Sequence, residues 1–169
     1  YHTSYSDDLN GVEVSAAIKN IFSMAVGASK GLCSINASED VREKNYLNTA
    51  SALIKQSVYE MEIFVEHLKG KKDTVKGLAG LGDLFVSSSG GRNARMGSYI
   101  GEGLIFSKAK KSKMEKVTVE GADLVIEIGK KVKQDFDETK LPLMIGMIDA
   151  ILEDKKLHLK WDLFRWKNF

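Results

Sequence analysis

The stretch Gly11-Val-Glu-Val-Ser-Ala-Ala-Ile-Lys-Asn-Ile-Phe-Ser-Met-Ala-Val-Gly27 decides the fold class of this 169-residue chain. Its apolar side chains recur every three or four residues, which is the spacing of one face of an α-helix: Val14, Ile18, Ile21, Phe22, Ala25 and Val26. Gly27 and Gly31 predict that the helix ends between about residues 27 and 32. Three polar side chains before the stretch could accept hydrogen bonds from the first free N–H groups of the helix: Asp7, Asp8 or Asn10.

Three later segments show the same helical spacing. The longest covers about residues 40–68, and Gly70 is its expected C-cap. The other two are Val119–Val132 and Leu143–Leu152. Pro142 suits the first turn of the last segment, because the N–H that proline lacks is not needed there.

Nothing in the sequence suggests a β-sheet. No alternation of apolar and polar residues persists beyond a few positions, and a single proline argues against a loop-rich β-sandwich. The closing segment Trp161–Phe169 is aromatic and basic, and we expect a short docking helix there. The prediction is an all-α chain that forms one domain over residues 1–169.

Composition excludes several function classes. With 43% hydrophobic residues and a net charge of +2, the chain is not expected to be disordered. The lone Cys33 excludes a disulfide framework and points to a reducing, cytoplasmic location. No apolar run is long enough to span a membrane. The three histidines are scattered, so no metal site is expected: His2, His67 and His158.

The middle of the chain holds most of its 15 glycines. Two short apolar pieces, Thr74–Leu78 and Leu81–Val86, are expected to be joined by tight turns. The polar segment Ser87–Asn93 that follows is expected to be a structured loop, because apolar pieces flank it. A lysine cluster comes after it and indicates a solvated face, so that nucleic-acid binding is not expected: Lys108, Lys110, Lys111, Lys113 and Lys116.

Three positions could carry chemistry. The helical neighbours of Lys19 include no carboxylate, so its ammonium could meet an anionic or carbonyl-bearing ligand, or simply be a solvated lysine at the helix edge. The closely spaced glycines of Gly77–Asp83 could allow close approach of backbone and ligand, or form a packing turn capped by the aspartate. Arg92, after Gly90-Gly91, offers a fork of donors suited to phosphate, or lies in an exposed turn.

In their order and residue sequence, these motifs resemble those of the C-terminal domain of the NAD(P)-dependent glycerol-3-phosphate dehydrogenases. The resemblance covers about residues 8–152. It is carried by Gly11–Asn20, by the sequence Gly77-Leu-Ala-Gly-Leu-Gly-Asp-Leu84, by Gly91–Asn93 and by Val119–Gly121. It implies an all-helical bundle of the 6-phosphogluconate dehydrogenase C-terminal-domain-like type, with substrate-binding and dimerisation roles.

The resemblance also implies an activity and its residues. The family interconverts dihydroxyacetone phosphate and sn-glycerol 3-phosphate by hydride transfer with NAD or NADP, in glycerophospholipid metabolism. Lys19 would exchange a proton with the C2 oxygen, and Asp83 and Asn20 would orient it and bind the substrate. The remaining roles are implied in the same way: Arg92 would hold phosphate and approach the cofactor, Asn93 and Ser87 would lie beside it, and Thr118 and Glu120 would contact the cofactor.

Three features depart from the family pattern. Ser15 and Ala16 stand where many bacterial relatives have two glycines. The loop before Arg92 is shorter than the bacterial one, which leaves the choice between Ser87 and Ser89 as the binding serine open. The chain also lacks the glycine fingerprint of a dinucleotide-binding domain, so we expect that an N-terminal domain supplies it and that this stretch alone has no appreciable turnover.

Two alternatives remain. The chain could belong to a related two-domain dehydrogenase of another hydroxy acid, or it could be a non-catalytic helical dimerisation module. Its expected partners are a small phosphorylated substrate, its own dinucleotide-binding domain and a second copy in a homodimer. Four apolar residues could extend a helix face into that second copy: Met144, Ile145, Ile148 and Ile151.

Overall fold

The computed structural model describes residues 5–34 and 39–165, except the side chains of residues 39–45. Every regular element in those ranges is helical, which confirms the all-α prediction. The α-helices are α1 (Leu9–Ser34), α2 (Glu39–His67), α3 (Lys72–Val75), α4 (Asp83–Ser88), α5 (Arg92–Gly101), α6 (Phe106–Lys113), α7 (Glu120–Asp135) and α8 (Pro142–Leu152). A π-helix, η1 (Leu78–Gly82), leads directly into α4, and a 3₁₀ turn, η2 (Trp161–Leu163), follows α8.

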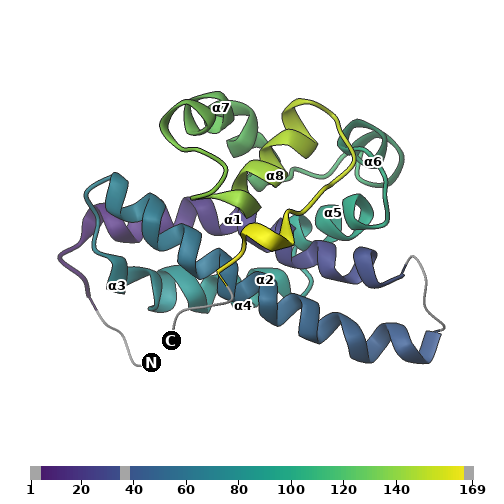
Figure 1. Cartoon of the computed structure of the whole chain (residues 1–169), viewed down its shortest axis with the longest axis horizontal. Coiled ribbons are helices and arrows are strands. Elements are labelled where there is room, and N and C mark those ends of the chain that lie inside the picture. Colours follow the sequence, from purple (N-terminus) through teal and green to yellow (C-terminus); the bar gives the residue numbers. More distant parts are fainter. Residues whose placement is uncertain (1–4, 35–38, 166–169) are drawn as a thin grey trace.

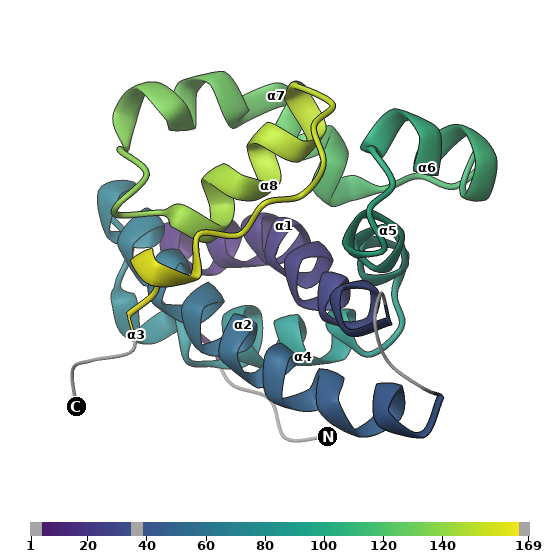
Figure 2. The ribbon, with the colours of Figure 1, turned by 45° about the vertical axis from the view of Figure 1, so that its right-hand side comes forward.

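Helix α1 is the centre around which the other helices pack. It contacts η1 and α2, α3, α4, α5, α7 and α8. α7 and α8 lie on one side of it and α2 and α4 on the other (Figure 1). Figure 2 shows that α5 lies against the C-terminal half of α1 and that α6 projects beyond α5. None of the helices in the described ranges combines the length and the apolar character needed to cross a membrane.

Glycines bring the backbones of α1 and α5 into direct contact. A Cβ added to Gly97 would lie 1.8 Å from the carbonyl oxygen of Met24, and one added to Gly27 would lie 2.2 Å from that of Ala94. One turn further along each helix, a Cβ added to Gly31 or Gly101 would likewise overlap a backbone carbonyl oxygen of the other helix. Since no side chain separates the two helices at these points, only glycine fits there.

The structure corrects two predictions. α1 does not end between residues 27 and 32 but continues to Ser34, because Gly27 and Gly31 serve the contact with α5 and do not terminate the helix. The expected loop Ser87–Asn93 is largely helical: α4 continues to Ser88 and α5 begins at Arg92. The helices α5 and α6 were not predicted at all.

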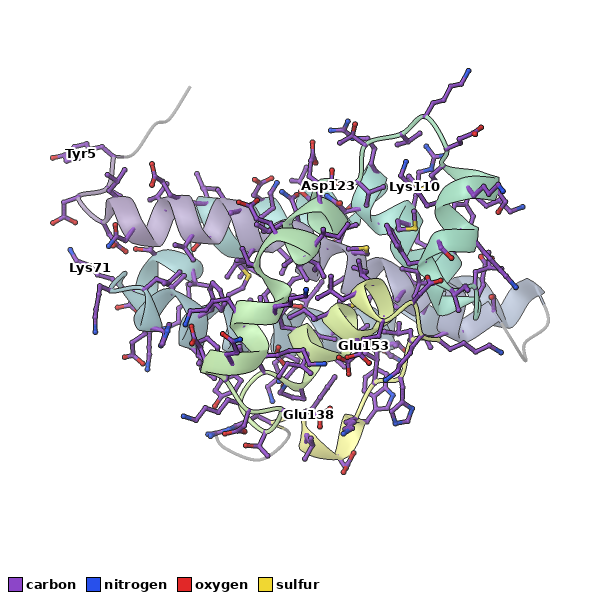
Figure 3. All side chains as sticks on the ribbon, turned by 90° about the horizontal axis from the view of Figure 1, so that it is seen from above. Tyr5, Lys71, Lys110, Asp123, Glu138 and Glu153 are labelled. Carbon is purple, nitrogen blue, oxygen red and sulfur yellow. The ribbon has the colours of Figure 1, made fainter. Side chains whose placement is uncertain are left out.

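The start of α1 is fixed by Asp8. Its Oδ1 accepts a hydrogen bond from the N–H of Gly11, so Asp8 is the capping residue among the three candidates. Its Oδ2 accepts bonds from the N–H of Lys71 and the hydroxyl of Thr74, and the latter bond is the main reason that the pKa of Asp8 is lowered. Lys71, just before α3, and Tyr5, just before α1, accordingly lie at the same end of the molecule (Figure 3). Asp8 therefore joins α1 to α3.

The end of α2 differs in detail from the prediction. Lys69, not Gly70, adopts the left-handed conformation, with φ of 67°. The N–H of Gly70 donates to the carbonyl oxygen of Val65, as in a Schellman motif. Gly70 is required for another reason: an added Cβ would lie 2.7 Å from the backbone nitrogen of Gly11.

Helix α8 is anchored by a buried carboxyl group. The two oxygens of Glu60 accept hydrogen bonds from the N–H groups of Leu143 and Met144, at 2.8 and 2.7 Å. Gln56 donates a third bond. Burial raises the pKa of Glu60 to about 8, although these three bonds favour the ionised form. Pro142 occupies the first turn of α8 as predicted.

Helix α8 lies inside the chain and offers no free apolar face. The four residues that were expected to extend such a face into a second copy are buried by other parts of the same chain: Met144, Ile145, Ile148 and Ile151. The segment after α8 is a short 3₁₀ turn with Phe164 buried in the core, where a docking helix was expected. Residues 166–169 of that expected helix lie outside the described residues.

The glycine contact predicts a large loss of stability for Gly97→Ala. The added methyl group would overlap a backbone carbonyl of α1 that cannot move aside, so the free energy of unfolding should fall by about 3 kcal/mol or more. Urea unfolding measures this. Gly77→Ala is the matched control, because its Cβ would meet nothing closer than 3.3 Å. Equal stability of the two variants would contradict the contact.

Glu60 predicts that stability falls as the pH rises through neutrality. Its pKa is higher in the folded chain than the ordinary value of 4.5, so the folded state holds a proton that the unfolded state releases. Its contribution is complete at low pH and is lost as the pH rises toward 8. Between pH 6 and pH 8 this amounts to roughly 2 to 3 kcal/mol of the free energy of unfolding.

Urea unfolding of wild type and Glu60→Gln at several pH values checks this prediction. The variant should lose the downward slope, even if it is less stable throughout. Glu66→Gln is the control, since Glu66 is exposed on the same helix. A slope in Glu60→Gln as steep as in the wild type would show that another group titrates.

Candidate functional site

Lys19 lies at the centre of a polar cluster between α1 and α4. Its Nζ is 2.6 Å from Oδ2 of Asp83 and donates a hydrogen bond to Oγ of Ser87 at 3.0 Å. The lysine side chain is 14% exposed and the aspartate side chain 42%. Lys19 has no carboxylate next to it on its own helix, and Asp83 of α4 supplies one. The ammonium is still partly exposed to solvent.

The π-helix and α4 aim Asp83 and Ser87 at Lys19. Asp83 begins α4, and Ser87 follows one turn later on the same face, with its hydroxyl 3.4 Å from Oδ1 of Asp83. Gly80, inside η1, lets this segment lie directly on α3, since an added Cβ would be 2.1 Å from the carbonyl oxygen of Val75. Of the glycines in the motif, Gly80 therefore sets the position of the aspartate by close backbone packing.

A second cluster joins α1, α5 and α7 next to the first. The amide nitrogen of Asn93 donates to Oδ1 of Asn20 at 3.1 Å, and its oxygen accepts from the N–H of Gly121 at 2.9 Å. Asn93 is buried, and Gly121 leaves no room for a Cβ against the backbone of Asn20. Because Asn20 directly follows Lys19 in α1, the second cluster adjoins the first, and we treat the two as one candidate site.

Arg92 and Glu120 lie at the edge of this site. They begin α5 and α7, respectively, and Nη2 of Arg92 is 2.5 Å from Oε1 of Glu120. Both side chains are about half exposed, at 52% and 47%. The guanidinium therefore has free donors that face solvent, and its partner is exposed enough to be exchanged for another anion.

The structure brings together seven of the eight predicted site residues. The exception is Thr118, which is exposed in the segment before α7 and whose side chain forms no hydrogen bond with the other described residues. The structure also distinguishes the two serines: Ser87 meets Lys19, whereas the hydroxyl of Ser89 donates to the backbone of Phe85. Sequence reasoning missed the backbone N–H of Gly121 as a partner of Asn93. The motif Val119–Gly121 marked the position but not this contact.

This arrangement suits the binding of a small anion and a proton transfer. A partly exposed ammonium held by a carboxylate and a hydroxyl can donate a proton to a nearby oxygen. An arginine fork at the rim can hold a phosphate. In the described part of the chain, no group of three or more His, Cys, Asp or Glu side chains is placed to bind a metal ion.

The chain matches the model of a protein family described as NAD-dependent glycerol-3-phosphate dehydrogenase C-terminus, over residues 8–159. A glycerol-3-phosphate dehydrogenase (NAD(P)+) of Pseudomonas aeruginosa is 34% identical over 154 residues, which are 90% of this chain and 41% of that protein. One from Clostridium tetani is 33% identical over 144 residues, which are 84% of this chain and 35% of that protein.

Solved structures show the same helical arrangement. The crystal structure of glycerol-3-phosphate dehydrogenase from Coxiella burnetii superposes with a TM-score of 0.71 at 30% identity, covering 89% of this chain and 42% of that one. The yeast enzyme, at 19% identity and a TM-score of 0.72 over 89% of this chain and 40% of its own, supports the fold alone. The expected bundle of the 6-phosphogluconate dehydrogenase C-terminal-domain-like type is confirmed.

The chain spans well under half the length of the relatives that it matches. The match nevertheless takes in all the elements from α1 to α8 and every residue of the site described above. The chain therefore belongs to the family of NAD-dependent glycerol-3-phosphate dehydrogenase C-terminal domains.

Proposed function

We propose that this chain is the substrate-binding and catalytic-lysine part of an enzyme that interconverts dihydroxyacetone phosphate and sn-glycerol 3-phosphate with NAD or NADP. The observation that carries the proposal is the ion pair of Lys19 with Asp83, in contact with Ser87 and next to the Asn20–Asn93 pair. The names of the relatives agree with this reaction. A dinucleotide-binding domain N-terminal to this one would complete the active site.

In this proposal Lys19 handles the proton of the reaction. As the carbonyl of dihydroxyacetone phosphate is reduced, negative charge develops on its oxygen, and the Lys19 ammonium stabilises that charge and donates the proton. The carboxylate of Asp83 at 2.6 Å holds the ammonium in place, and the Ser87 hydroxyl accepts a second of its three donors. One donor remains for the substrate oxygen.

Arg92 binds the phosphate group in this proposal. The guanidinium has five N–H donors in a planar fork, and it contacts Glu120 through Nη2. A phosphate can take the remaining donors or displace the half-exposed carboxylate. Asn93 acts differently, because Asn20 and the N–H of Gly121 already occupy its amide. One amide N–H is left for the ligand, so Asn93 mainly positions its neighbours.

The residues present fit the reacting end of a dinucleotide and not its phosphates. Arg92 and Glu120 are exposed side by side at the rim, and Thr118 is exposed two residues before Glu120 in the chain. The chain has no G-x-G-x-x-G sequence to cradle a pyrophosphate. When bound, the nicotinamide supplies or accepts the hydride. This chain supplies the proton, the phosphate contact and the orientation of the substrate.

The homodimer and the cytoplasmic location stay predictions. Cys33 is a free thiol beside the hydroxyl of Thr49, and a free thiol is usual for a reducing compartment. The α8 residues that were expected to meet the second copy are buried within the chain, so a dimer would have to use another surface.

Lys19→Ala should abolish most of the turnover. In the protein that carries this chain together with a dinucleotide-binding domain, we expect kcat to fall by ~10²–10⁴, the usual cost of losing a general acid. Oxidation of NADH or NADPH in the presence of dihydroxyacetone phosphate gives the rate. Lys108→Ala, on the exposed face of α6, is the matched control. If Lys19→Ala turned over at a near-normal rate, Lys19 would not be the proton donor.

Arg92→Lys should affect phosphate binding more than chemistry. It retains the positive charge but loses the fork, so the KM for dihydroxyacetone phosphate should rise by roughly 10-fold or more. The effect on kcat should be smaller than that of Lys19→Ala. Steady-state kinetics with phosphorylated and unphosphorylated substrate tests this. If the variant lost equal activity with both, Arg92 would not serve the phosphate group.

A further inference from the structure

A polar cavity lies between α1, α4 and α5, outside the Lys19 site. Its volume is about 150 Å³. The residues that matter for its chemistry come from all three helices and the turn between α4 and α5: Lys30, Ser88, Gly90, Arg95, Ser98 and Tyr99. None of them belongs to the site described above.

The two sites are separated along both helices. Lys30 follows Lys19 by eleven residues of the same helix, which is roughly 16 Å at 1.5 Å per residue. Asn93 points from α5 toward Asn20 and α7, whereas Arg95, two residues later, lies about 200° further around the helix. A ligand beside Arg95 would therefore not touch the Asn20–Asn93 pair.

The glycine contact of α1 with α5 brings two cations to this cavity. Lys30 lies in α1 between Gly27 and Gly31, and Arg95 follows Ala94, whose carbonyl oxygen Gly27 approaches most closely. The helices meet here backbone to backbone. Two long basic side chains from different helices consequently line one small cavity.

The positive charge of the cavity is not neutralised by the described residues. Neither Lys30 nor Arg95 forms a salt bridge with them, and no carboxylate is among the residues that line the cavity. Nζ of Lys30 lies 5.4 Å from the centre of the Tyr46 ring, a contact that does not cancel its charge. Among the described residues, the carboxylate of Glu102 accepts a long hydrogen bond of 3.5 Å from the Ser98 hydroxyl, one turn earlier in α5.

Hydroxyl and backbone groups complete the lining. The hydroxyl of Ser88 donates to the carbonyl oxygen of Phe85 but can turn, and that of Ser98 holds only the long contact to Glu102. Gly90, with φ of 153°, has no atom within 4 Å of the place where a Cβ would be, so its backbone is open to a ligand. Two cations with hydroxyl donors are the groups that bind a tetrahedral oxyanion.

We propose that this cavity binds a small phosphate-type oxyanion, either inorganic phosphate or the phosphate of a small monoester. Lys30 and Arg95 supply the charge, and Ser88 and Ser98 supply further donors. The volume is below the range of about 300–1,000 Å³ that is usual for larger ligands, and this favours a small anion. The proposal does not rest on the proposed enzymatic function, because it concerns other residues and needs no turnover.

Titration of the isotopically labelled chain with sodium phosphate, followed by amide NMR shifts at constant ionic strength, tests the proposal. The amides of Gly90 and Ser98 should shift and saturate. Lys30→Gln and Arg95→Gln should each raise the apparent Kd reported by these amides by about 10-fold, because each removes a charged donor. Added NaCl should weaken the binding in the wild type.

Arg92→Gln is the control that separates the two sites. It should leave the phosphate response of Gly90 and Ser98 unchanged while altering any response near Asn93. Lys108→Gln controls for the general loss of one surface charge. Circular dichroism of each variant checks that the helices are retained, as expected for exposed side chains.

A parallel titration with glycerol phosphate distinguishes free phosphate from a monoester as the natural source. Tighter binding of one of the two at Gly90 and Ser98 identifies that source, and either result supports the site. The proposal is overturned if these amides respond to neither ligand. It is also overturned if their response survives in the Lys30→Gln, Arg95→Gln double variant, or disappears in Arg92→Gln.

Discussion

The direct contact of the α1 and α5 backbones is the constraint on which the rest of the structure depends. Gly27, Gly31, Gly97 and Gly101 remove the side chains that would hold the two helices apart. The contact sets the distance from Asn20 to Asn93, and through Asn93 it places the first turn of α7. It also brings Lys30 and Arg95 to one cavity. Both the family site and the proposed anion site therefore depend on one helix crossing.

Much of the fold could be read from the sequence, because its four longest helices bury one apolar stripe each. The long helices α1, α2, α7 and α8 show that stripe, and the position of Pro142 followed from proline chemistry. Capping chemistry narrowed the cap of α1 to three residues, of which the structure selects Asp8. α5 was missed because Gly97 and Gly101 lower its local helix propensity. Gly27 and Gly31 likewise led to a wrong prediction for the end of α1. In both cases the glycines serve a contact between distant segments, which local patterns do not reveal.

The family resemblance named the residues of the candidate site and paired Asp83 with Lys19, whereas residue spacing alone revealed none of their contacts. The partner of Lys19 comes from α4, and no spacing rule connects two segments so far apart in the chain. The choice of Ser87 over Ser89 follows from helical phase, since Ser87 lies one turn after Asp83. Because Ser87–Asn93 was predicted to be a loop, the helical spacing between Asp83 and Ser87 was not recognised. The pairing of Arg92 with Glu120 likewise needs the positions of two helix starts.

Asn93 has a consequence for how this domain can change during evolution. Its buried amide joins three helices, and the same amide lies inside the site that would hold the substrate. A substitution there that adapts the site to a new substrate also removes hydrogen bonds that hold the fold. Such a change would be accepted only after stabilising substitutions elsewhere had accumulated. New specificity should therefore arise first at the exposed rim, where Arg92 and Glu120 can vary without loss of the fold.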